Sequence, residues 1–142
     1  MSDDAPAGFA PHFKTSGLTA PWEPLYSRRT ADAFQIGLRA GPAHANSRGF
    51  VHGGLIAALA DNAMGLSCGL QLEPGSNLVT VGLAVDFIAT ARQGEWLEIR
   101  PVVLKAGKSL AFCTATIHAD ERLCARANAT FRALERTTAA AA

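Results

Sequence analysis

The chain has 142 residues, of which 49% are hydrophobic and only 18% are charged, and its formal net charge is +1. This balance argues against a nucleic-acid-binding domain, which needs a clustered basic excess, and against a disordered chain. No stretch reaches the roughly 18 apolar residues of a membrane span, and the acidic start of the chain is unlike a signal peptide. We expect a cytoplasmic domain that hides part of its weakly charged surface against a second copy.

Residues 1–32 are rich in proline and glycine, which argues against a long helix or a central strand there. We expect this segment to be an arm that packs Trp22, Leu25 and Tyr26 onto the domain. The domain itself is expected at 33–134, and a frayed tail at 135–142.

The first strand of the domain is expected at 34–39, where apolar and other residues alternate. The one long helix is predicted at 53–69, which is rich in Ala, Leu and Met and contains no proline. One stripe of this helix carries large aliphatic residues and suits a sheet, and it includes Leu66 and Leu70. The opposite face, with mostly small residues plus Met64 and Cys68, suits close approach by the same helix of a second subunit.

Strand signals dominate after the helix. Residues 78–87 alternate, and 96–104 form another candidate strand in which Pro101 indicates an edge or a bulge. Residues 110–118 and 123–131 predict a hairpin. One helix followed by an antiparallel run predicts an α+β domain, with a curved antiparallel sheet wrapped around one long central helix.

The three cysteines, Cys68, Cys113 and Cys124, show no metal-binding spacing. We expect them to be small buried apolar residues, as is usual for free cysteines in a reducing compartment.

Asp61 is the only formal charge between Arg48 and Glu73, and it falls on the small-residue face of the predicted helix. Burying a lone carboxylate is costly unless something compensates, so Asp61 is either a functional group or is paired with an arginine or a helix end. His52-Gly53-Gly54 precedes the helix, where free backbone N–H groups attract developing negative charge and glycine lets a ligand approach closely.

Asp61 lies nine residues after His52, which is about 13.5 Å along a helix. One chain can therefore hardly bring both to the same reacting atom. Two antiparallel copies of the helix would place Asp61 of one chain near Gly53 of the other, so the sequence predicts a site shared across a dimer.

Asn46, His52-Gly53-Gly54, Asp61 and Gly65 resemble the motif of hotdog-fold acyl-CoA thioesterases of the phenylacetic-acid-degradation (PaaI) type. The similarity continues into the strands that follow and covers about residues 33–134. It implies a hotdog fold and hydrolysis of an aryl- or medium-chain acyl-CoA to free CoA and a carboxylic acid. It also implies a homodimer or a homotetramer built as a dimer of dimers, without metal or cofactor and without nucleic-acid or membrane partners.

By this resemblance, the Gly53 N–H polarises the thioester carbonyl, and Asp61 of the partner subunit acts as general base or as nucleophile. Asn46 helps to hold the water or the carboxylate, and His52 supports the thioester end. Thr80 stands where the family often has a small hydroxyl residue. His52 has an equally good structural reading as a loop residue, and Thr80 has one as a strand former.

Four further residues are expected to contact substrate: Gly54, Phe87, Lys105 and Lys108. The two lysines would meet the phosphates of CoA, unless they are simply solvated. Two other functions stay open for the same fold, an enoyl-thioester hydratase and a non-catalytic acyl-CoA-binding module.

Overall fold

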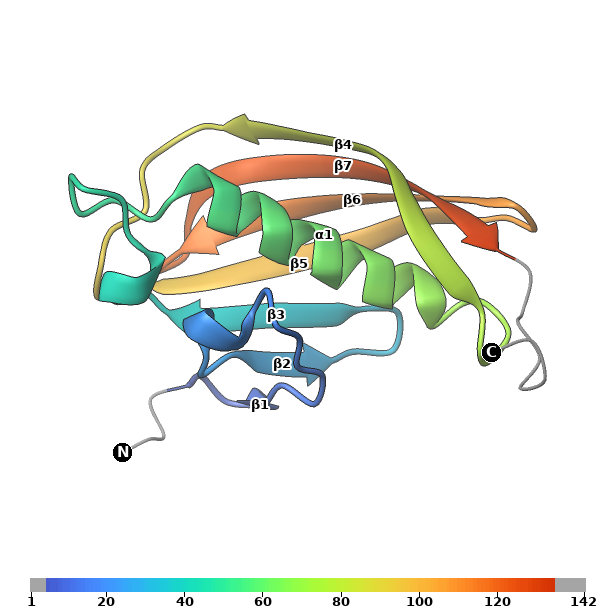
Figure 1. Cartoon of the computed structure of the whole chain (residues 1–142), viewed down its shortest axis with the longest axis horizontal. Coiled ribbons are helices and arrows are strands. Elements are labelled where there is room, and N and C mark those ends of the chain that lie inside the picture. Colours follow the sequence, from blue (N-terminus) through green and yellow to red (C-terminus); the bar gives the residue numbers. More distant parts are fainter. Residues whose placement is uncertain (1–4, 135–142) are drawn as a thin grey trace.

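The computed structural model describes residues 5–134 and packs one helix across the concave face of a seven-stranded antiparallel sheet (Figure 1). The order of the strands in the sheet is β1-β2-β3-β5-β6-β7-β4, so β1 and β4 form its two edges. The predicted α+β class is confirmed. The elements are β1 (Ala10–Pro11), β2 (Tyr26–Arg29), β3 (Phe34–Arg39), α1 (Gly53–Gly69), β4 (Asn77–Phe87), β5 (Trp96–Ala106), β6 (Leu110–Ala119) and β7 (Arg122–Leu134).

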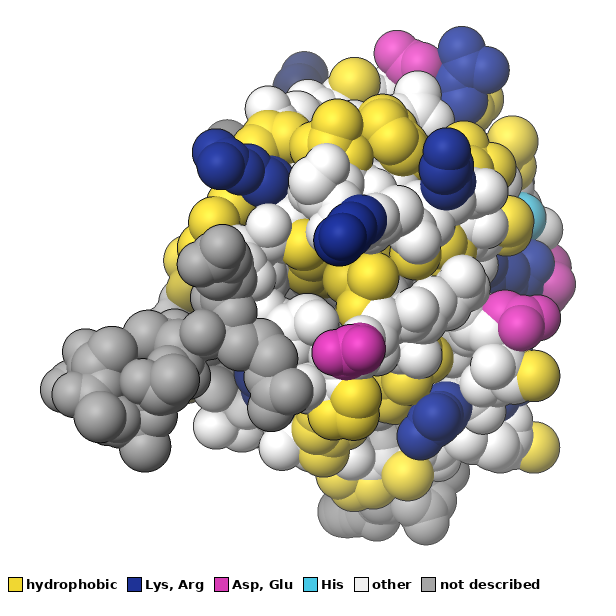
Figure 2. All heavy atoms as spheres, turned by 90° about the vertical axis from the view of Figure 1, so that its right-hand side faces the viewer, with side chains coloured by type: hydrophobic (Ala, Val, Ile, Leu, Met, Phe, Trp, Pro, Cys, Tyr) yellow, Lys and Arg dark blue, Asp and Glu magenta, His cyan; other side chains and the backbone are white. Residues whose placement is uncertain are grey.

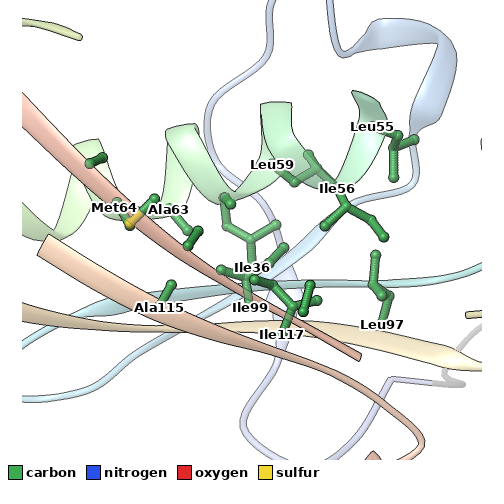
Figure 3. Close-up of a cluster of buried hydrophobic side chains, with 14 of the residues drawn as sticks. Ile36, Leu55, Ile56, Leu59, Ala63, Met64, Leu97, Ile99, Ala115 and Ile117 are labelled. Atoms are coloured by element: carbon green, nitrogen blue, oxygen red, sulfur yellow. The ribbon is translucent and has the colours of Figure 1, made fainter. Parts of the chain in front are cut away.

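Helix α1 has the bounds that the sequence predicts, and its large apolar side chains fill the space above β3, β5, β6 and β7 (Figure 3). Ile56, Leu59 and Met64 are among the side chains buried there. Each such side chain contributes about 1.5–3 kcal/mol when fully buried. This packing fixes the axis of α1 relative to the sheet, and with it the position of every polar group on the helix.

The predicted division of α1 into two faces is wrong at its C-terminal half. Met64 and Cys68 are fully buried against the sheet, whereas Leu66 and Leu70 are only half-buried. The reason is the helical period, because Met64 and Cys68 continue the stripe that starts at Ile56 and runs through Ala60, at steps of four. All three cysteines are buried and unpaired, as expected.

Pro101 was expected to mark an edge or a bulge, and it lies where β5 has no partner on the side of β3, although β5 as a whole stands between β3 and β6 in the sheet. The last residue of β5 that pairs with β3 is Ile99, opposite Ile36. Pro101 lies just past this pair, so its missing N–H breaks no bond to β3. The bulge in β5 occurs later, between Val103 and Lys105.

The hairpin from β6 to β7 turns at Asp120 and Glu121, both of which have positive φ angles of 45° and 71°. Two successive left-handed residues give the turn the twist that antiparallel strands require. The long β6 and β7 ladders thus run together with almost every residue paired, and β4 joins them on the far side of β7.

The segment before residue 33 adds to the sheet. Strand β2 pairs with β3, and the short β1 pairs with β2 at the sheet edge. Leu25 is buried in the core and Trp22 packs against it. The division of the chain at 32/33 stays a proposal, and the predicted tail at 135–142 lies outside the described residues. In the described part of the chain, no helix is long and apolar enough to cross a bilayer.

Candidate active site

Asp61 lies in the middle of α1 and receives a hydrogen bond from β4. The Thr80 hydroxyl donates to Asp61 Oδ1 over 2.7 Å. A hydroxyl that donates to a carboxylate forms a stronger bond than one between neutral groups. Asp61 is half-buried, and no described arginine or lysine forms an ion pair with it. The cost of partly burying the Asp61 carboxylate is therefore offset by the Thr80 hydroxyl and by solvent. The alternative, pairing with an arginine or a helix end, is not what the structure shows for the described residues.

The first turn of α1 leaves one backbone donor free. His52 Nδ1 accepts the Gly54 N–H over 2.8 Å, and the His52 carbonyl accepts the N–H groups of Leu55 and Ile56. No described residue accepts a hydrogen bond from the Gly53 N–H. This donor lies at the positive end of the helix dipole, where negative charge is stabilised. The arrangement makes His52 a helix cap and occupies the Gly54 N–H.

Asn46 shapes the loop that leads into α1. Its Oδ1 accepts the backbone N–H groups of Arg48 and Phe50, over 2.9 and 3.1 Å. These bonds close a turn in which Gly49 adopts a φ of 82° that suits glycine. The side-chain oxygen of Asn46 is thus committed to the loop, which leaves its amide nitrogen for any contact with water or substrate.

Phe87 lies at the end of β4 and covers the start of α1. A Cβ atom placed on Gly53 would come within 3.1 Å of Phe87 Cζ, so the ring lies directly against the glycine. The Phe87 side chain is 56% exposed. An exposed aromatic ring beside a free N–H offers an apolar contact for whatever binds there.

Lys105 and Lys108 lie elsewhere. Both are exposed where β5 ends and the chain turns toward β6, at the opposite end of the molecule from Gly53. Figure 2 shows this end, where hydrophobic side chains alternate with Lys and Arg side chains. A single chain does not bring the two lysines to the helix start.

Gly53 and Asp61 are also separated within one chain. They are eight residues apart on an unbroken helix, which is about 12 Å at 1.5 Å per residue. The structure therefore joins Asp61 to Thr80, and Gly53 to His52 and Phe87, as two separate groups.

A cavity of about 630 Å³ opens beside Asp61 and Thr80. Its size is typical of small-molecule sites. Its walls come from α1, β3, β4, β7 and the segment before β2. The apolar residues that line it are Phe13, Phe34, Leu66, Leu70, Leu78 and Phe131. Sequence reasoning missed this cavity, because nothing in the sequence distinguishes Phe13 from the other aromatic residues of the arm, Phe9, Trp22 and Tyr26.

His12 also lines the cavity. Burial lowers the pKa of this histidine, and Lys14 acts in the same direction, while the Glu23 carboxylate opposes them. His12 is therefore biased toward its neutral form. Within the described residues, no group of three or more His, Cys, Asp and Glu side chains is arranged to hold a metal ion.

Comparisons with known proteins show which family and fold the chain shares. The model of the thioesterase superfamily matches residues 48–125, a range that contains His52, Gly53, Asp61 and Thr80. A Pseudomonas aeruginosa protein with a provisional esterase name is 40% identical over 129 residues, which are 90% of this chain and 96% of that protein. Human acyl-coenzyme A thioesterase 13 is 40% identical over 76 residues, 52% of each chain.

Two solved structures share the fold. A Bacillus halodurans protein solved with CoA has a TM-score of 0.76 and 25% identity, and the match covers 89% of this chain and 83% of that one. A mutant of the phenylacetic acid degradation protein PaaI from Thermus thermophilus has a TM-score of 0.70 and 22% identity, over 78% and 93% of the two chains. The expected helix and curved sheet are thus those of the hotdog fold.

Proposed function

The chain belongs to the thioesterase superfamily, and from this premise we propose that it hydrolyses an aryl- or medium-chain acyl-CoA to free CoA and a carboxylic acid. The observation that carries this proposal is Asp61, the only formal charge in α1, held by Thr80 at a cavity of suitable size. Support for CoA esters comes from the likeness to acyl-coenzyme A thioesterase 13 and to a protein solved with CoA.

In the proposed reaction, Asp61 takes a proton from a water molecule as the water oxygen adds to the thioester carbonyl carbon. The Gly53 N–H stabilises the negative charge that develops on the carbonyl oxygen. The carbon–sulfur bond then breaks, and the departing CoA thiolate takes up the proton that Asp61 accepted from the water, which regenerates the carboxylate. A single donor of this kind contributes about 2.7–4 kcal/mol, and a positioned base about 10²–10⁴-fold in rate.

The free Gly53 N–H and the bonded Asp61 are about 12 Å apart along one helix, so we propose that a homodimer assembles each site from two chains. Gly53 of one chain would meet Asp61 of the partner subunit, and the two-fold axis would create two equal sites. Phe87, which lies against Gly53, would then contact substrate at the junction.

Strand β4 supports this assembly. It is an edge strand that pairs only with β7, so its other side presents unpaired backbone groups. Val79, Val81 and Leu83 on β4 are 41%, 56% and 41% exposed. Pairing with β4 of a second copy would satisfy these groups and cover the apolar side chains. The proposal has three further parts. Two dimers associate into a tetramer, Lys105 and Lys108 contact the phosphates of CoA, and the protein is located in the cytoplasm.

The test is thioester hydrolysis by the purified protein, followed with a thiol-trapping dye over aryl- and alkyl-CoA esters. We expect the Asp61→Asn protein to lose about 10²–10⁴-fold in kcat while its folding and its affinity for CoA esters are retained. Activity within a few-fold of the parent protein would overturn the assignment of Asp61. A parent protein that binds CoA esters without hydrolysing them would overturn the proposed activity.

A further inference from the structure

We propose that residues 12–16 and Thr19 of the arm form the wall that selects the acyl group, with Phe13 as the specificity-determining residue. This inference rests on the proposed thioesterase function. It assigns to the arm a preference for acyl groups with a long or broad apolar body over acetyl-sized groups. The arm lies outside residues 48–125, the range that the superfamily model matches, so this wall is not part of the matched core.

The cavity extends along α1 in one direction only. From Asp61 it follows Gly65 and Gly69, which are spaced by one helical turn each, over about 12 Å. This direction leads away from Gly53. A thioester carbonyl held at Asp61 would therefore direct an apolar chain or ring along this trough, the part of the cavity beside Gly65 and Gly69. A Cβ atom placed on Gly69 would meet no atom within 4 Å, so the trough is open there. An acetyl group would end before reaching the arm.

Aromatic side chains form the walls of the trough. Phe13 of the arm lies against Phe34 of β3, with ring centroids 5.3 Å apart. Phe131 of β7 lies on the other side, where its Cε1 is 3.3 Å from the position of a Cβ atom on Gly65. The backbone of Phe34 is held against α1, because its N–H donates to Ser67 Oγ over 2.9 Å. Of these rings, Phe13 is the most exposed, at 62%, and it is the one that a bound apolar group would cover.

The arm is attached at the sheet edge. The His12 N–H donates to the Leu25 carbonyl over 2.9 Å, and β1 pairs with β2 immediately before it. Thr19 is buried, and its N–H donates to Ser16 Oγ, which closes the loop between them. Residues 12–19 therefore form a defined loop against the trough.

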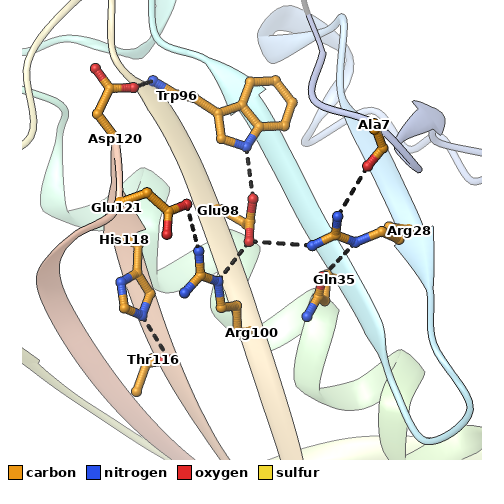
Figure 4. A network of polar contacts seen from close by, with 10 residues as sticks. All are labelled: Ala7, Arg28, Gln35, Trp96, Glu98, Arg100, Thr116, His118, Asp120 and Glu121. Atoms are coloured by element: carbon orange, nitrogen blue, oxygen red, sulfur yellow. Dashed lines mark hydrogen bonds and ion pairs between the residues drawn. The ribbon is translucent and has the colours of Figure 1, made fainter.

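A second attachment lies on the opposite face of the sheet (Figure 4). Arg28 donates to the Ala7 carbonyl over 3.1 Å, and its guanidinium lies 4.5 Å from the Phe9 ring centroid. The Phe9 ring in turn packs edge-on against Trp96. Residues 7–9 of the arm thus contact the face of the sheet that is turned away from α1. The arm then crosses the sheet edge at β1, and Phe13 lines the trough on the side of the helix.

The test compares kcat/KM for acetyl-, hexanoyl-, decanoyl- and phenylacetyl-CoA in the full chain and in its Phe13→Ala variant. Phe13 is mostly exposed, so its truncation should leave the fold intact. We expect the decanoyl-to-acetyl and phenylacetyl-to-acetyl ratios to fall about tenfold, equivalent to 1.4 kcal/mol, with acetyl-CoA unchanged within twofold. Leu18→Ala is the matched control, because Leu18 is 64% exposed in the same arm and does not line the cavity.

Unchanged ratios in Phe13→Ala, or an equal loss on all four esters, would overturn the role of the arm. Binding of S-decyl-CoA and S-methyl-CoA, two non-hydrolysable thioethers, separates this outcome from failure of the proposed function. If the parent protein hydrolyses no ester, the proposed function is wrong. In that case a tenfold loss of affinity for S-decyl-CoA but not for S-methyl-CoA in Phe13→Ala would still support the role of Phe13 in the wall. Equal affinities of the parent protein and Phe13→Ala for S-decyl-CoA would overturn it.

Discussion

The Thr80 hydroxyl lies 2.7 Å from Asp61 Oδ1 and joins the edge strand β4 to the middle of α1. The two residues are 19 positions apart in the chain, and the bond exists only because β4 returns beside the helix that precedes it. It orients a carboxylate that has no other described partner. We therefore propose that Thr80 is a positioning residue for Asp61.

The first prediction concerns this bond. Thr80→Val keeps the shape of the side chain but removes the donor, so the carboxylate loses its fixed orientation. A hydrogen bond to a charged group contributes about 1.5–3 kcal/mol, so we expect kcat to fall about 10- to 100-fold. Thr80→Ser restores the hydroxyl and should recover most of the rate. Steady-state kinetics of the parent protein, Thr80→Val and Thr80→Ser test this role of Thr80. Equal kcat values for the two variants would contradict it.

The second prediction concerns stability. Glu98 is 5% exposed and accepts hydrogen bonds from Trp96 Nε1 and Arg100 Nε, over 3.0 and 2.6 Å (Figure 4). Glu98→Ala leaves both donors without this acceptor. We expect the free energy of unfolding to fall by about 1–3 kcal/mol, measured by urea unfolding at a fixed protein concentration.

The matched control for Glu98 is Asp86→Ala. The Asp86–Arg126 pair lies on the surface, with side chains 64% and 68% exposed. Exposed pairs of this kind contribute about 0–1 kcal/mol. Equal losses in the two variants would show that the buried position of Glu98 adds nothing.

The third prediction concerns pH. Burial disfavours the charged form of His12 and holds its pKa below 6.5 in the folded protein. The folded state therefore binds this proton less readily than the unfolded state. The contribution of His12 to stability is complete above pH 6.5 and is lost as the pH falls from 6.5 through the folded-state pKa. An NMR titration of the His12 ring, assigned with His12→Asn, checks this, and a pKa at or above 6.5 would contradict it.

The bounds of α1 and β3 followed directly from the sequence. Residues 34–39 alternate between apolar and other residues, and residues 53–69 are rich in Ala, Leu and Met without proline, so the helix begins at Gly53 and ends at Gly69 as predicted. The error at Met64 and Cys68 arose because the helix is apolar nearly all round, so composition did not tell which side faces the sheet. Pro101 correctly indicated an open edge, but local sequence did not reveal that this edge begins where the pairing with β3 stops.

At the candidate site, Asp61 stood out because it is a single charge in an apolar helix, and no knowledge of the fold was needed to notice it. The bond from Thr80 depends on how β4 is placed, which spacing along the chain does not encode. Likewise, the cavity wall at Phe13 arises from an arm that crosses the sheet edge. Such a contact joins residues far apart in the sequence and leaves no periodic signal.

The fourth prediction addresses the shared site. Gly53→Pro removes the N–H at the first position of α1, where proline is well tolerated. His52 already has a ψ of 133°, which suits a residue before proline. Gly53→Ala is the control for the added carbon, because it keeps the N–H but crowds Phe87 Cζ at 3.1 Å as the proline ring also does. We expect Gly53→Ala to lose part of its activity by displacing Phe87, and Gly53→Pro to be nearly inactive because it also lacks the N–H.

The most direct measurement mixes the Gly53→Pro and Asp61→Asn chains in equal amounts, by refolding together, and records thioester hydrolysis. If each site takes Gly53 from one chain and Asp61 from its partner, half of the chains supply an intact Gly53 and half of their partners an intact Asp61. About one quarter of the parent activity should then return from two nearly inactive proteins. Activity that stays at the sum of the two variants measured alone would contradict a site built from two chains.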